Sequence, residues 1–192
     1  MIENIIEIGK ENKDLYKNNT PFAHIKLENI FPNDLLDGVL SDIEKTEYDY
    51  FKFCTVGNCF SEFGESTVKL TDYLVGDEWV EFLRNMTEIK DLKSDKSWHG
   101  AGINIEPRGS HLEPHTDFNT HNGMWRRVNV LLFLSKDWKD EWGGHNELGH
   151  IEGKHYVVDR KYKPEFNNLI VFNTSNYSYH GFDLVSCPND KN

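Results

Sequence analysis

The sequence has few cysteines, no long apolar run and no signal peptide. Three cysteines occur among 192 residues, and Cys54 and Cys59 have no second pair with which to form a zinc knuckle. We therefore expect reduced thiols and a cytoplasmic location. No stretch approaches the ~20 apolar residues that a membrane span needs. The acidic N-terminus, residues 1–7, lacks the basic and apolar regions of a secretory signal.

Positive charge is also scarce. Twenty-one basic residues face 32 acidic ones, which gives a formal net charge of −11. Nucleic-acid binding depends on clustered Lys and Arg, so a nucleic-acid partner is disfavoured. Walker, Rossmann and nucleophile-elbow patterns are missing too, which removes the commonest nucleotide-binding and acyl-transfer functions.

Apolar stripes at helical spacing predict two helices in the first half of the chain. The first follows Pro32-Asn33-Asp34 and comprises Leu35, Leu36, Val39, Leu40 and Ile43. The second opens at Gly76-Asp77-Glu78 and comprises Trp79, Phe82, Leu83, Met86 and Ile89. Between them, the aromatic residues 48–53 predict a strand.

The second half carries short β-branched and aromatic runs separated by Gly, Asn, Pro and Asp, a pattern typical of strands. The strongest run covers residues 127–134, and the others are 156–158, 169–172 and 179–185. Helices first and strands after predict an α+β fold, mainly β, with helices packed on one side of a β-sandwich or barrel. We expect a single domain over residues 1–192, with 1–95 as a helical or mixed support and 96–192 as the β core.

An acidic residue stands two positions after a histidine at four places, and in so acidic a chain some of these pairs arise by chance. Residues i and i+2 of a strand point to the same face, so His115 and Asp117 can reach one ion. The partner candidate is His180, just after the predicted strand 169–172. Two imidazoles and one carboxylate without thiolate form a facial triad that suits non-haem Fe(II) better than structural zinc. The alternative is a surface pair and a packed histidine.

A rival motif is His145-Asn146-Glu147-Leu148-Gly149-His150, which looks like a metalloprotease helix. Its histidines are five residues apart rather than four. On a helix this spacing separates them, and on a strand it places them on opposite faces. Gly149 is also a poor helix residue, so we disfavour this site.

From about residue 100 to 190 the chain resembles the iron(II)- and 2-oxoglutarate-dependent dioxygenases, specifically the prolyl-4-hydroxylase-like branch. The features that carry the resemblance occur in the family's order. They are the HxD motif His115-Thr116-Asp117, the following strand (126–138), the pair Gly143-Gly144 that opens the next strand, and the strand 164–172 before the distal His180-Gly181. Outside this range, residues 21–32 also look like the family's N-terminal strand before its first helix.

The resemblance implies a double-stranded β-helix, a jelly-roll or cupin-like barrel with N-terminal helices packed on one sheet. It also implies a catalytic metal triad of His115, Asp117 and His180, with Fe(II), 2-oxoglutarate and O₂ as cofactor and co-substrates. A C–H bond of the substrate would be hydroxylated, giving succinate and CO₂, and the family default is a prolyl peptide.

The co-substrate contacts depart from the family pattern. Phe133 stands where the family usually has a tyrosine, and Asn129 on the same strand face is an alternative donor. The family's basic anchor for the far carboxylate maps only to Lys191. The segment 187–192 reads like the loop before the anchor strand, so we expect C-terminal strands to be truncated. Otherwise Arg126 or Arg127 would substitute, or the co-substrate site would be degraded.

Two further functions remain open. One is a non-catalytic jelly-roll binding protein that retains the metal site, and the other is a zinc hydrolase on the same barrel. The substrate, whether small molecule or peptide, and the oligomeric state cannot be read from the sequence.

Overall fold

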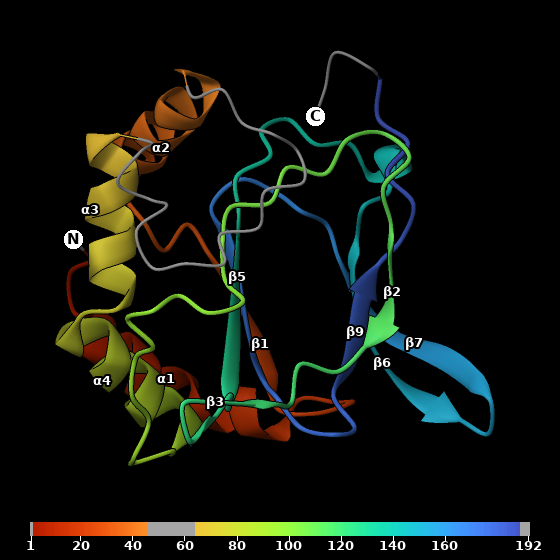
Figure 1. The fold of residues 1–192 in the computed structure, drawn as a ribbon, viewed down its shortest axis with the longest axis horizontal. Helices are drawn as coiled ribbons and strands as arrows, with labels where there is room; N and C mark the ends of the chain where they lie inside the picture. Colours follow the sequence, from red (N-terminus) through yellow and green to blue (C-terminus); the bar gives the residue numbers. More distant parts are fainter. Residues whose placement is uncertain (1, 46–63, 189–192) are drawn as a thin grey trace. The chain divides into compact units, whose positions relative to one another are not determined.

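The computed structural model describes residues 2–45 and 64–188. Two compact units make up the chain (Figure 1). The first comprises residues 1–14 and 29–104, and the second comprises residues 15–28 and 105–192. Within the described residues, none of the helices has the length and apolarity that crossing a bilayer requires.

The first unit is helical, and both helices predicted from apolar stripes are confirmed. They are α2 (Asn33–Lys45) and α4 (Asp77–Thr87). Leu35, Leu36 and Val39 of α2 are buried, as the stripe predicted. The segment 48–53, predicted as a strand, lies outside the described residues.

Two helices were not predicted. In α3 (Glu65–Leu74), two of the four buried side chains are Thr67 and Thr71, so its inner face carries no apolar stripe. Helix α1 (Ile5–Asn18), which continues into the second unit, has its apolar residues near its two ends and a polar middle. Tertiary packing, rather than periodicity, therefore identifies both helices.

Aromatic side chains form the centre of the helical unit. Trp79 of α4 is 2% exposed. Its ring stacks on Phe31 at 5.6 Å between centroids and lies 4.8 Å from Phe82. Offset and tilted aromatic pairs of this kind add stability beyond the area that they bury.

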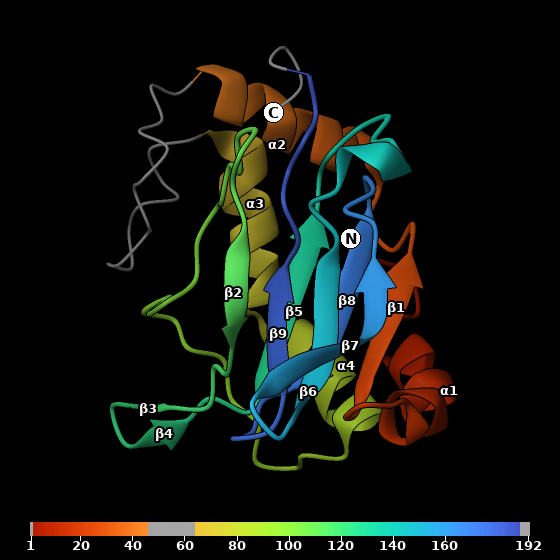
Figure 2. The ribbon, with the colours of Figure 1, turned by 90° about the vertical axis from the view of Figure 1, so that its right-hand side faces the viewer.

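The second unit contains two antiparallel sheets, and every predicted strand of the second half is found (Figure 2). One sheet has the order β1-β8-β5, and the other has the order β2-β9-β6-β7. Their strands are β1 (His24–Glu28), β8 (Asn168–Asn173), β5 (Val128–Phe133), β2 (Leu112–His115), β9 (Tyr179–Phe182), β6 (Asn146–Glu152) and β7 (His155–Tyr162). Helices together with antiparallel sheets confirm the α+β class.

A small hairpin stands apart from both sheets. It pairs β3 (Thr120–His121) with β4 (Met124–Trp125). Asn122 and Gly123 both have positive φ, 48° and 74°, which is the geometry of a tight hairpin turn. The Gly/Asn-rich segment that follows Asp117 is therefore a turn.

The core of the second unit lies between its two sheets. Ile170 and Phe172 of β8 pack with Leu148 of β6 and with Phe22, all of them buried. Leu131, Phe133 and Tyr162 pack against this cluster. Residues 131 and 133 thus share an inward face, as the strand alternation predicted.

Candidate metal centre

Three side chains converge where β2 meets β9. These strands pair antiparallel with His115 directly opposite His180. Asp117 follows just beyond the end of β2. One donor atom from each of the three residues lies within 4.8 Å of the other two. In residues 2–45 and 64–188 no other group of three His, Cys, Asp or Glu side chains has this arrangement.

Both imidazoles are held in the tautomer that a metal ligand needs. Nδ1–H of His115 donates to the Glu113 carbonyl at 2.9 Å, and Nδ1–H of His180 donates to the Ser178 carbonyl at 3.3 Å. With the proton on Nδ1, each Nε2 presents a lone pair. Backbone carbonyls therefore orient both rings, as they commonly do for ligating histidines.

Asp117 faces both rings. Its Oδ2 lies 3.4 Å from Nε2 of His180, and its Oδ1 lies 3.7 Å from Nε2 of His115. Nη1 of Arg126 is 3.5 Å from Oδ1. Burial would raise the pKa of the Asp117 carboxyl, but the hydrogen bond and charge of His180 in its protonated form, then the charges of Arg126 and of protonated His115, together lower it. The group is thus an anion at neutral pH, as a metal ligand must be.

The triad has a protected side and an open side. His180 is 5% exposed, and its ring lies 4.7 Å from that of Phe172. The His115 side chain is 37% exposed. A molecule can thus approach from the His115 side, while Phe172 covers the other side.

The remaining predicted site residues have different positions. Asn129 turns its amide to Asp117, with Nδ2 donating to Oδ2 at 2.6 Å. Phe133 packs against the apolar core cluster. Lys191 lies outside the described residues. The contact of Arg126 with Asp117 was not predicted, because it depends on the path of the β3–β4 hairpin between the two residues.

The rival histidines do not share a site. His145 precedes β6, where Nδ1 faces Asp183 at 3.2 Å and Nε2 faces Asp140 at 3.1 Å. His150 lies on β6 itself and pairs with Asp159 at 2.6 Å. The segment is a strand rather than a helix, so the protease-like arrangement is excluded.

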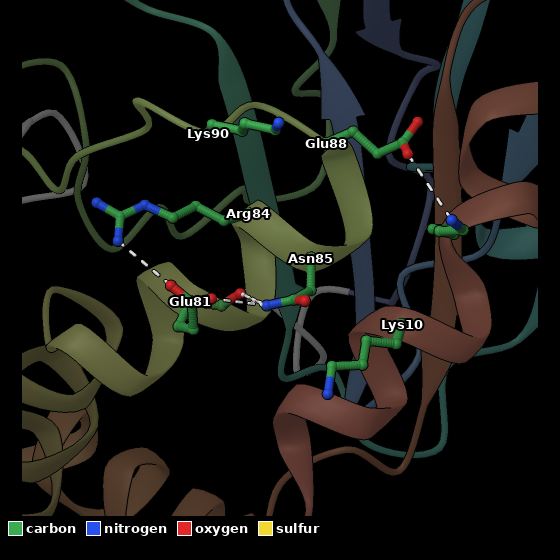
Figure 3. A pocket seen from close by; sticks show the side chains of 7 residues that line it. Lys10, Glu81, Arg84, Asn85, Glu88 and Lys90 are labelled. Carbon is green, nitrogen blue, oxygen red and sulfur yellow. Dashed lines mark hydrogen bonds and ion pairs between the residues drawn. The ribbon is translucent and has the colours of Figure 1, made fainter.

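A separate cavity of about 590 Å³ lies in the first unit, between α1, α4 and the residues after α4 (Figure 3). Four of its charged side chains are engaged in ion pairs with one another. Arg84 pairs with Glu81 at 3.3 Å, and Asn85 donates to the same carboxylate at 2.9 Å. Lys13 lies 3.8 Å from Glu88. We assign no ligand to this cavity.

Comparison with known proteins supports the metal centre. The family model of the 2OG-Fe(II) oxygenase superfamily matches residues 101–191, a range that contains the whole triad. No curated protein sequence matches the chain.

Solved structures of prolyl hydroxylases share the fold. A prolyl-4-hydroxylase of Pseudomonas putida matches with a TM-score of 0.59 and 12% identity, over 97% of this chain and 88% of that chain. A prolyl 4-hydroxylase of Phytophthora capsici matches with a TM-score of 0.63 and 18% identity, over 96% of this chain and 60% of that chain. A Trichoplax adhaerens prolyl hydroxylase in complex with a peptide fragment matches with a TM-score of 0.61 and 15% identity, over 96% of this chain and 86% of that chain.

Fe(II), 2-oxoglutarate and O₂ are the cofactor and co-substrates of the matched superfamily, and the donor set of two imidazoles and one carboxylate fits Fe(II). Residues 101–191 thus resemble the 2OG-Fe(II) oxygenase superfamily of dioxygenases, and the chain has a prolyl 4-hydroxylase-like fold.

Proposed function

We propose that this chain is an oxygenase in which His115, Asp117 and His180 hold Fe(II) and a substrate C–H bond is hydroxylated. The observation that carries the proposal is the convergence of these side chains, with both Nε2 atoms directed at the Asp117 carboxylate. Three protein ligands leave octahedral positions open for a co-substrate and O₂.

The bound metal would supply the oxidative chemistry, in which 2-oxoglutarate, O₂ and R–H give succinate, CO₂ and R–OH. The protein orients the metal ligands and shields them from water. Backbone carbonyls of Glu113 and Ser178 fix the two rings, and Phe172 keeps water from one side of His180. The exposed side of His115 leaves room for the substrate.

We further propose that the two sheets form a double-stranded β-helix within one domain, with residues 1–95 as its support. Two observations support a jelly roll. Phe172 and His180 face each other from opposite sheets, and an apolar cluster lies between the sheets. Asn129, Phe133 and Lys191 remain the proposed co-substrate contacts, although one amide N–H of Asn129 already serves Asp117.

We propose a peptide, by default a prolyl peptide, as the substrate, because the Trichoplax relative of the same fold is a prolyl hydroxylase in complex with a peptide fragment. Hydroxylation of a prolyl peptide by the wild-type protein tests the substrate separately from the metal site. A cytoplasmic location and the absence of a nucleic-acid partner stay predictions, the latter based on the net charge of −11.

The test uses anaerobic protein with Fe(II) and 2-oxoglutarate. We expect a weak visible charge-transfer band, and succinate formation once O₂ is admitted. His115→Ala and His180→Ala should lose both signals. His150→Ala, a surface histidine on β6, should keep them. A wild-type protein with neither band nor succinate would refute the oxygenase.

The second candidate is a jelly-roll protein that binds the metal without turnover. Phe133 favours it, because this residue offers no hydroxyl to the co-substrate. Metal binding without succinate formation would support this candidate. Metal analysis of the purified protein distinguishes the oxygenase and the binding protein, which would hold iron, from a zinc hydrolase.

A further inference from the structure

The side chain of Asn129 is fixed at both of its polar ends. Its Oδ1 accepts a hydrogen bond from the Val130 N–H at 2.9 Å, and its Nδ2 donates to Oδ2 of Asp117 at 2.6 Å. Exchange of the amide oxygen and nitrogen would set a carbonyl against a carboxylate and an N–H against an N–H. The network thus assigns the donor end to Asp117.

The backbone that carries Asn129 is equally constrained. Asn129 is the second residue of β5 and lies opposite Phe172 of β8 in a ladder that pairs all six residues of β5. Phe172 in turn contacts the ring of His180. Asn129 therefore reaches Asp117 from the sheet opposite to the one that carries both histidines.

We propose that Asn129 is a positioning residue that orients the Asp117 carboxylate for the metal. The inference rests on the proposed function, since it needs the triad to bind an ion. Asp117 lies beyond the end of β2, so the strand ladder that fixes His115 does not fix this carboxylate. A hydrogen bond from a rigid strand supplies the missing constraint.

The contact of Asp117 with Arg126 is less suited to this task. The Arg126 guanidinium lies 3.5 Å from Oδ1, farther than the 2.6 Å bond from Asn129. Its positive charge also opposes a cation bound to the same carboxylate. A neutral amide orients the ligand without repelling the ion.

The experiment measures Mn(II) and Co(II) affinity of the full chain without co-substrate, in the wild type and in Asn129→Ala and Asn129→Leu. We expect both variants to bind 10- to 100-fold more weakly, the loss typical when a ligand loses its hydrogen-bonding partner. At saturating Co(II) their visible d–d spectra should differ from the wild-type spectrum, because the carboxylate is reoriented. A role confined to packing would not change the spectrum of the saturated site.

The matched control is Asn119→Ala, which removes an exposed amide two residues after Asp117 in the chain. It should bind like the wild type. Circular dichroism without metal checks that each variant folds. If Asn129→Ala does not fold, Asn129→Leu carries the test, because the leucine side chain has the same number of heavy atoms as asparagine.

Each outcome discriminates. Wild-type affinity and an unchanged spectrum in Asn129→Leu overturn the positioning role while the oxygenase proposal stands. A wild type that binds neither ion, or one whose affinity survives His115→Ala, overturns the metal site and with it both proposals.

Discussion

His24 illustrates how one buried polar residue couples this fold to pH. It is fully buried, its Nδ1–H donates to the Phe22 carbonyl at 2.8 Å, and its Nε2 accepts from the Tyr162 hydroxyl at 2.6 Å. Both bonds are complete with a neutral ring. Burial, the largest influence, lowers the pKa of His24 below its usual 6.5, and nearby Arg160 adds to this.

We therefore predict an acid-sensitive contribution to stability from His24. The unfolded chain takes up a proton near pH 6.5 and the folded chain does so only at lower pH, so the contribution is complete above pH 6.5 and declines below it. His24→Gln should cost about 1–2 kcal/mol at pH 7.5 through lost hydrogen bonds. Between pH 7.5 and 5.5 the variant should lose less stability than the wild type.

Urea denaturation at the two pH values measures this difference. His155→Gln, at an exposed position of β7, is the control and should follow the wild type. Equal pH slopes for His24→Gln and the wild type would contradict the prediction.

At the scale of elements, the pairing of β2 with β9 brings together the two histidines of the candidate metal centre, and Gly181 permits that pairing. A Cβ at this position would overlap the Leu112 carbonyl on β2. Glycine in a strand often marks such a close backbone approach. Since Gly181 is adjacent to His180, any separation of the two strands also moves His115 away from its partner.

We predict that Gly181→Ala destabilises the protein by about 1–3 kcal/mol, the usual cost of overpacking, and weakens Mn(II) binding. Gly123→Ala provides the comparison. Gly123 has a φ of 74° and open space around its Cβ position, so it should cost about 1 kcal/mol through backbone strain alone. Urea denaturation measures the stability of both variants, and Mn(II) titration measures their metal affinity. Equal Mn(II) affinities of Gly181→Ala and Gly123→Ala would contradict the prediction that the close approach at Gly181 holds the site together.

The whole molecule should gain stability from the metal, because an ion that binds only the folded state shifts the unfolding equilibrium. At an Mn(II) concentration 100 times the dissociation constant the gain is about 2.7 kcal/mol. For a chain of this size that corresponds to a rise in Tm of about 5–11 °C. If the units unfold separately, the transition of the second unit should shift, since it contains the triad.

Thermal denaturation with and without Mn(II) tests this expectation. His180→Ala should abolish the shift, whereas His150→Ala should retain it. A shift of the same size in His180→Ala would place the binding site elsewhere.

The sequence alone determined the helices with apolar stripes, the strands of the second half and the identity of the three triad residues. Helix α2 is predictable because its apolar stripe reports which face is buried, and strand β8 is predictable because its unbroken apolar run matches a strand that is buried on both faces. Four histidine–acid pairs share the spacing that can place two side chains on one side of a strand, and the resemblance to the dioxygenases selected His115 and Asp117 among them. The inner face of α3, where two of the four buried side chains are threonines, carries no such signal, and only packing identified it.

Tertiary structure decided the rest. The sequence does not encode locally that His115 pairs with His180, because register between distant strands depends on the whole sheet. It also could not show that the Asn129 amide and the Arg126 guanidinium both face Asp117, or that His24 meets Tyr162 across 138 residues. Strand alternation predicts that a side chain points inward, but the partner that it contacts there is set by the facing sheet.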